Sequence, residues 1–214
     1  MSEPTRTSPL GHRAPLDSGD GKARLTEKPF LGLLQLRGAP AVIAEAVETT
    51  TGATLTNSPN TSTGRNGISL MPLGPDEWIV RTPAGEGRDI FAAIDEALTG
   101  THHQLVDVGA YYTTIEIAGA RARDLLAKIA IVDLHPRAFG PGDGVASVFA
   151  KAAGWLIMTR GDDVDDGPAF ELITRRSHAD YLWCLLAESG REWGLASQQP
   201  IGREKLHLPH LAGC

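Results

Sequence analysis

The segment Asp133-Leu-His-Pro-Arg-Ala-Phe139 places chemically versatile side chains in an irregular stretch of chain. Pro136 disfavours helical backbone at the residue before it, so the preceding helix must have ended by His135. Its histidine, arginine and phenylalanine are therefore expected on a turn. Two interpretations stay open: a cap, in which Arg137 binds carbonyls and Phe139 fills the core, or a surface that recognises a partner.

A second basic segment, Arg175-Arg176-Ser177, stands where a strand is expected to end and a helix to begin. Helix N-termini attract anions, and arginine adds bidentate donors for a carboxylate. The two arginines therefore predict either a docking site for a partner carboxylate or an ion pair with Asp180 or the acidic 162–166 run. Ser177 is expected to be the N-cap of the helix.

The sequence offers only weak metal and thiol candidates. Cys184 lies in an apolar run and is expected to be a buried small hydrophobe rather than a reactive thiol, with a disulfide to Cys214 left open. The histidines 207 and 210 with Cys214 could form a metal cluster, but structural zinc needs four ordered ligands, so a solvated tail is favoured. The 162–166 run lacks the distal glutamate of a calcium loop and is expected to be a solvated hairpin tip.

Overall charge and hydropathy exclude some classes of function. The net charge of -6 argues against nucleic-acid binding, which favours a basic surface. Apolar runs fall short of the roughly 20 residues that span a bilayer, and residues 1–28 contain no apolar signal-peptide core. The expected location is the cytoplasm, and no strong catalytic motif of the dinucleotide, phosphate-loop, nucleophile-elbow or zinc-protease type occurs.

Hydrophobic periodicity predicts the elements that position these segments. Short runs rich in Val, Ile, Leu and Trp predict strands, and apolar residues at helical spacing predict four helices. The Thr, Asn, Ser and Gly residues of 52–66 predict an exposed loop. The expected strands are 30–36, 68–71, 78–80, 105–108, 112–117, 145–150, 154–159 and 169–174, and the expected helices are 40–51, 87–98, 119–129 and 177–192.

The two halves of this pattern resemble each other. The run Leu34–Ala39 matches Ile115–Ala120, and Trp78–Thr82 matches Trp155–Thr159. The fold is therefore expected to be α+β, with two related β-α-β-β modules, about 30–100 and 105–192, sharing a core.

The ends of the chain differ in composition from the regular region 29–193. Residues 1–28 are rich in Pro and Gly and predict an extended N-terminal arm. Leu10 and Leu16 in that arm are expected to lie on a partner, because a short segment cannot recover its ordering entropy alone. Residues 194–214 are expected to form a C-terminal tail.

Several segments together are similar to the γ subunit family of heterotetrameric sarcosine oxidase. They are Ser8-Pro-Leu10, Ala14-Pro-Leu16, Gly74-Pro-Asp-Glu-Trp-Ile79, Asp133-Leu-His-Pro-Arg-Ala-Phe139 and Arg175-Arg-Ser177 with Ala179-Asp-Tyr-Leu182. The resemblance covers roughly residues 7–190. Its specificity comes from the order of these widely separated segments.

The resemblance implies a subunit of an assembly with α, β and δ partner chains. That assembly oxidises sarcosine to glycine with oxygen, releases hydrogen peroxide and passes the one-carbon unit to tetrahydrofolate as 5,10-methylenetetrahydrofolate. FAD, FMN, NAD, tetrahydrofolate and zinc are expected in the partner subunits, and none in this chain. The resemblance also implies the folate-binding fold of aminomethyltransferases, and it favours His135, Arg137, Phe139, Arg175 and Arg176, with Leu10 and Leu16, as partner contacts.

One departure bears on activity. Active relatives of that fold carry acidic residues on the strand after the hairpin glycine, whereas here it reads Trp155-Leu156-Ile157-Met158. An apolar run cannot transfer a proton, so the expected role is structural. A stand-alone folate-dependent one-carbon transferase and an unrelated small-molecule binding protein are the alternatives.

Overall fold

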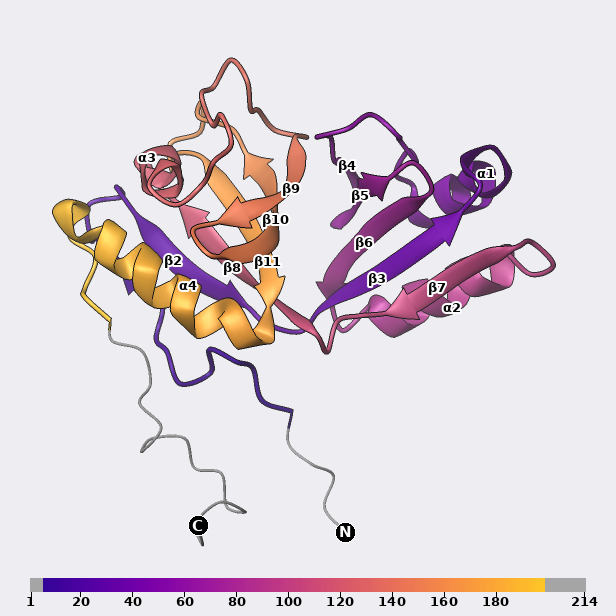
Figure 1. Ribbon diagram of the computed structural model, residues 1–214, viewed down its shortest axis with the longest axis horizontal. Coiled ribbons are helices and arrows are strands. Elements are labelled where there is room, and N and C mark those ends of the chain that lie inside the picture. The colour runs from indigo at the N-terminus through magenta and orange to yellow at the C-terminus, as the bar shows by residue number, and fades with distance from the viewer. Residues whose placement is uncertain (1–5, 199–214) are drawn as a thin grey trace, which may run out of the picture.

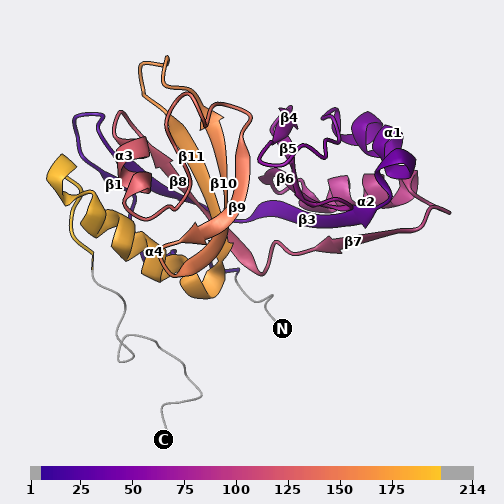
Figure 2. The same cartoon turned by 45° about the horizontal axis from the view of Figure 1, so that its top comes forward.

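A computed structural model describes residues 6–198 of the chain. Two antiparallel sheets face each other, and a pair of helices covers the outer face of each (Figure 1). The turned view keeps α1 and α2 at one end of the molecule and α3 and α4 at the other (Figure 2). The order helices, sheet, sheet, helices is a mixed α+β architecture, as the sequence predicts. None of the described helices is long and apolar enough to cross a membrane.

The first sheet has six strands and the second has five, all paired antiparallel. In spatial order the six are β1 (Leu16–Asp17), β2 (Arg24–Lys28), β8 (Tyr112–Ala118), β11 (Ala169–Arg175), β10 (Ala152–Arg160) and β9 (Gly144–Phe149). The five are β4 (Thr63–Arg65), β5 (Ile68–Gly74), β6 (Glu77–Ala84), β3 (Leu31–Gly38) and β7 (His103–Asp107).

The four helices lie where periodicity predicts them, with changes at some ends. They are α1 (Pro40–Thr51), α2 (Gly87–Ala97), α3 (Ala122–Ala127) and α4 (Arg176–Ser189), followed by the short η1 (Arg191–Trp193). Helix α3 begins after Gly119 because that residue has a φ of 112°, outside the helical region. Helix α4 begins at Arg176, so the prediction of Ser177 as N-cap is wrong, and no side chain caps this end.

The two halves exchange their first strands. Strand β2 precedes β3 in sequence but pairs with β8, at Leu25 opposite Ile117. Strand β7 precedes β8 but pairs with β3, at Leu105 opposite Leu36. Each half therefore contributes its leading strand to the sheet of the other half, which interlocks them.

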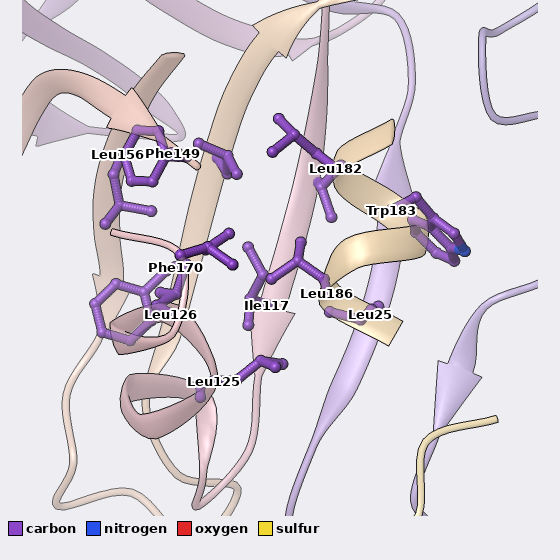
Figure 3. Packing of buried hydrophobic residues seen from close by; sticks show 14 of the residues in the cluster. Leu25, Ile117, Leu125, Leu126, Phe149, Leu156, Phe170, Leu182, Trp183 and Leu186 are labelled. Carbon is purple, nitrogen blue, oxygen red and sulfur yellow. The ribbon is translucent and has the colours of Figure 1, made fainter. Parts of the chain in front are cut away.

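This exchange corrects the prediction that residues 1–28 form an extended arm outside the fold. Leu10 and Leu16 are 1% and 8% exposed, and Leu25 is fully buried. Figure 3 shows Leu25 beside Leu186 of α4 and Ile117 of β8. Proline and glycine at 9–21 suggested a flexible segment, but this segment leads into the paired strands β1 and β2.

The internal repeat is present, but one of its two sequence matches is wrong. Strands β3 and β8, which carry the first match, occupy the same place in their sheets. Trp78 lies on β6 and Trp155 on β10, whereas strand order makes β11 the counterpart of β6 and β10 the counterpart of β5. A Trp-led apolar run suits any central strand, so it could not identify which one.

The core is divided into three clusters. The largest lies between the six-stranded sheet and α3 and α4 (Figure 3), and the second lies between the other sheet and α1 and α2. Only a small cluster joins the inner faces of the two sheets, and it consists of Leu33, Met71, Ile79, Ile157 and Ile173. Four partly buried hydrophobic residues pack against this cluster: Leu73, Val108, Tyr112 and Trp155.

Candidate functional site

A cavity of about 410 Å³ opens between the two sheets. The β4–β5 hairpin and β6 form one wall, and β10 and β11 form the other. Polar and apolar groups share the lining, which consists of Ser62, Gly64, Arg65, Asn66, Gly67, Ile68, Ser69, Arg81, Gly142, Ile157, Met158, Thr159 and Glu171. This volume lies in the range of small-molecule sites.

A tight hairpin turn forms the rim of the cavity. Asn66 and Gly67 both have positive φ, 52° and 80°, and Arg65 pairs with Ile68 across the turn. Asn-Gly suits a two-residue hairpin because both central residues must adopt left-handed backbone. The sequence contains this signal, but 52–66 was expected to be a loop, so strand β4 was missed.

The two sheets lie close together at Gly144 of β9. A Cβ there would lie 2.8 Å from Met71 Sδ and 3.1 Å from Ser62 Cβ, so only glycine fits without displacement. The backbone N–H of Ser62 donates to the Gly142 carbonyl at 2.6 Å. These contacts join the loop before β4 to the start of β9 and close one end of the cavity.

Glu171 is the most buried ionisable side chain of the site, at 1% exposure. It stands on β11 directly opposite Glu116 of β8, where like charges repel. Lys28 of β2 offsets this repulsion, because its ammonium contacts Glu116 and lies 3.1 Å from Glu171 Oε1. Arg81 of β6 reaches across from the other sheet and donates from Nη2 to Glu171 Oε1 at 2.5 Å. The ion pairs therefore link both sheets.

The pKa of Lys28 reports this balance of charges. Partial burial of its side chain disfavours the charged ammonium, but the hydrogen bond to Glu116 and the charges of Glu171 and Glu116 outweigh that cost. The net effect raises the pKa of Lys28 above its ordinary value. The lysine is thus held charged between two carboxylates.

Two polar atoms of this site have no hydrogen-bond partner among the described residues. They are Glu171 Oε2 and Arg81 Nε, both buried. The other side of the Arg81 guanidinium is held by the Gly67 carbonyl, which accepts from Nη1 at 2.9 Å. Both atoms have almost no accessible surface, so the Arg81–Glu171 ion pair is enclosed by the protein around it.

Sequence reasoning missed Lys28, Arg81 and Glu171. Its prediction that the strand at 155–158 is apolar fits the structure: Ile157 and Met158 line the β10 wall. The acidic group of the cavity comes from the next strand instead. A lone Glu within the apolar run Ala169–Thr174 was the available signal, since a charge in a buried strand needs a partner.

In the segment 133–139 the structure bears out the part of the cap interpretation that concerns Phe139, but not the part in which Arg137 binds carbonyls. Phe139 is 3% exposed and packs against Phe170, so it fills the core and its side chain is unavailable as a surface contact. His135 and Arg137 are exposed. The His135 ring accepts from the Arg137 backbone N–H at 3.2 Å, and no described residue pairs with the Arg137 guanidinium.

The structure separates Arg175 and Arg176 from the carboxylates expected for them. Asp180 pairs with Arg13, with Nη2 to Oδ1 at 2.7 Å, and with His12. Arg175 lies over the Tyr111 ring, 5.2 Å from its centroid, and Arg176 donates to the Thr7 carbonyl. Arg175 is exposed and Arg176 half-buried.

Of the candidate thiol and metal-binding residues, Cys184 lies in the part of the chain that the structure describes. Cys184 is 6% exposed, and burial, with the charge of Asp180, raises the pKa of its thiol, which fits a small hydrophobe. Within residues 6–198, no group of three or more His, Cys, Asp or Glu side chains is placed to hold a metal. The candidates His207, His210 and Cys214, and with them the disulfide, lie outside the described residues.

Comparisons with known proteins identify the family. The model of the "Sarcosine oxidase, gamma subunit family" matches residues 37–192, most of the chain. The chain belongs to this family. A sarcosine oxidase subunit gamma from Corynebacterium sp. (strain P-1) is 32% identical over 159 residues, which are 70% of this chain and 75% of that protein. The predicted resemblance is thereby confirmed.

The fold of the sarcosine oxidase gamma family also occurs in aminomethyltransferases. A chain of heterotetrameric sarcosine oxidase from Corynebacterium sp. U-96 superposes with a TM-score of 0.79 at 24% identity, covering 91% of this chain and 99% of that chain. Aminomethyltransferase T from Bartonella henselae gives 0.59 at 16% identity, covering 79% and 46%. At these identities the likeness shows the fold, and it confirms the predicted aminomethyltransferase-like α+β class.

Proposed function

We propose that this chain is the non-catalytic gamma subunit of a heterotetrameric sarcosine oxidase. The assembly would oxidise sarcosine to glycine with oxygen, release hydrogen peroxide and form 5,10-methylenetetrahydrofolate. The observation that carries the proposal is the family match over residues 37–192. We expect the assembly to work in the cytoplasm.

The redox groups belong to the partners in this proposal. FAD, FMN, NAD, tetrahydrofolate and zinc are assigned to the alpha, beta and delta subunits. The β10 wall of the inter-sheet cavity consists of Ile157, Met158 and Thr159, so it has no acidic side chain to place against a folate ring. No catalytic step is therefore assigned to this chain.

The exposed arginines are the proposed contacts with the partner chains. Arg137 and Arg175 carry exposed guanidinium groups, and His135 lies beside the first of them. Arginine is enriched at the centres of interfaces because it combines several donors with a flat surface. Arg176 is kept in the proposal, whereas Leu10, Leu16 and Phe139 are removed from it because their side chains belong to the core of this chain.

The alternative is a stand-alone folate-dependent aminomethyltransferase-like protein. An aminomethyltransferase from Herpetosiphon aurantiacus is 30% identical over 123 residues. Those residues are 58% of this chain but only 33% of that protein, so most of the enzyme has no counterpart in the match. This coverage favours the subunit proposal.

Co-purification distinguishes the two. The tagged full chain, expressed in its native cell, should bring down flavin-containing partners that mass spectrometry identifies, and the complex should release hydrogen peroxide from sarcosine. The chain expressed alone should be colourless and produce no peroxide. Recovery of the chain without partners, together with one-carbon transfer to tetrahydrofolate by the chain alone, would establish the alternative.

A further inference from the structure

Strand β7 leaves its backbone edge open, in contrast to the other edge strands. Within the described residues the two sheets end in β1, β9, β4 and β7. An edge strand presents unpaired backbone groups, so proteins commonly shorten it or cover it. Strands β1 and β4 have only two and three residues. On β9, the Gly144 N–H donates to the Asn60 carbonyl and the Ala150 N–H to the Ile129 carbonyl, so loops cover both ends.

Strand β7 has neither of these protections. It has five residues, contains no proline or lysine, and lies at the margin of its sheet, paired with β3 on one side (Figure 1 and Figure 2). The Val108 N–H donates to the Leu33 carbonyl of β3 at 2.9 Å. Because backbone groups alternate along a strand, those of His103, Leu105 and Asp107 point away from β3. No described residue hydrogen-bonds to these outward groups.

We propose that β7 pairs antiparallel with β7 of a second copy of this chain, around a two-fold axis at Leu105. The outward residues are spaced symmetrically about Leu105, so this register sets Leu105 opposite itself and His103 opposite Asp107 of the second copy. Each outward N–H then meets an outward carbonyl, as in any antiparallel ladder. The same patch serves both copies, which is the geometry of most protein dimers.

The side chains of β7 suit this register. Val106 is in register with Gln35 and Ile79, so it lies on the inner face of the sheet, where it is 37% exposed. In the dimer it would stand opposite Gln104 of the second copy. Leu105 packs on the other face, beside α2, and would gain cover from the same leucine of the second copy. Like charges do not face each other, which would oppose pairing.

The connection from β7 to β8 keeps the larger parts of the two copies apart. Strand β7 leads from Asp107 into the six-stranded sheet of its own chain. Because the paired strands run in opposite directions, the two six-stranded sheets would lie at opposite ends of the joined strands (Figure 1). The two five-stranded sheets would become one continuous sheet. Every contact comes from this chain, so the inference does not depend on the proposed function.

The test is analytical ultracentrifugation of the full chain, expressed alone, with two matched double variants. Gln104→Lys with Val106→Lys sets lysine opposite lysine on both sides of the axis and should weaken dimerisation about tenfold or more. Gln104→Lys with Val106→Glu changes the same exposed positions but sets opposite charges across the axis, so the dimer should persist. Equal melting temperatures at low protein concentration would show that both variants fold.

Three results would overturn the proposal. One is a chain that stays monomeric up to millimolar concentration. Another is a dimer that persists equally in both double variants, because it would then use a different surface. The third is a monomeric chain whose co-purified partners are lost only in the double-lysine variant, which would assign the edge to a strand of a partner. Co-purification of flavin-containing partners is a separate result, since a subunit can assemble whether or not β7 pairs with a second copy.

Discussion

At the scale of single residues, one lysine resolves a conflict between two carboxylates. Glu116 and Glu171 are direct partners on neighbouring strands, and their repulsion would oppose the pairing of β8 with β11. Lys28 contacts both, and Arg81 contacts the more buried of the two. The pairing therefore depends on a cation from β2, an exchanged strand.

Replacing this lysine should have an effect that depends on pH. Because the folded pKa of Lys28 is raised, its stabilising contribution is fully present below the ordinary lysine pKa and is lost as pH rises through the folded pKa. Lys28→Met should lower the free energy of unfolding by about 1–2 kcal/mol at neutral pH. It should also make stability fall less steeply as pH rises above 10.5, the ordinary lysine pKa.

The measurement is urea unfolding of Lys28→Met and of the unchanged chain at a series of pH values from neutral to strongly alkaline. Lys22→Met is the control, since Lys22 pairs with the exposed Asp20 and its replacement should change stability little. Parallel pH profiles for Lys28→Met and the unchanged chain would contradict the role assigned to Lys28.

At the scale of elements, the leading strand of each half belongs to the opposite sheet. Strand β2 covers the edge of β8, and its Leu25 packs between the sheet and α4. Removing this strand would expose a row of backbone groups on β8 as well as apolar core. The N-terminal segment is therefore expected to be required for folding.

Truncation of one buried leucine tests this expectation without removing backbone. Leu25→Ala should cost about 2–5 kcal/mol, because the side chain is fully buried and leaves a cavity. Val42→Ala, at a site that is 61% exposed, should change stability by less than about 0.5 kcal/mol. Denaturant unfolding of the free chain measures the loss of stability in each variant. Equal losses in Leu25→Ala and Val42→Ala would show that the N-terminal segment is not part of the core.

At the scale of the whole molecule, the two halves share little apolar surface. The cluster between the inner faces has five buried members, whereas the other clusters lie beneath the helix pairs. Exchanged strands and the Arg81–Glu171 pair add to that small contact. The helical layers and the connecting loops form the outside, where a partner chain would bind.

Loss of one exposed arginine should weaken assembly without affecting the fold. Arg137→Ala removes a guanidinium that has no partner among the described residues, so the melting temperature of the free chain should stay unchanged. Affinity for the proposed partner subunits should fall about tenfold or more, because an arginine at an interface centre often contributes that much. Arg121→Ala, an exposed arginine that pairs with Asp124 on α3, is the control for surface charge.

The assay is size-exclusion chromatography of the complex at limiting concentration. We expect the complex that contains Arg137→Ala to dissociate. The complex that contains Arg121→Ala should stay intact. A complex that stays intact in both variants would remove the 133–139 turn from the interface.

Local pattern was enough to predict most elements and the family. The helix at 40–51 has the expected ends because Pro40 suits the first turn and Gly52 ends the helix in left-handed backbone. The strands near 112–117, 154–159 and 169–174 follow from runs of β-branched and apolar residues. The helical and strand periodicities depend only on residues close together in the sequence, so they can be read from a single sequence.

Only the tertiary structure decided which strands pair and which charges meet. Residues 24–28 read as part of a polar arm because their partner β8 begins at Tyr112, far along the chain. For the same reason, the contact between Arg81 of one sheet and Glu171 of the other could not be predicted from the sequence. Local propensity determines what a segment can become, whereas pairing across long separations depends on the packing of the whole chain.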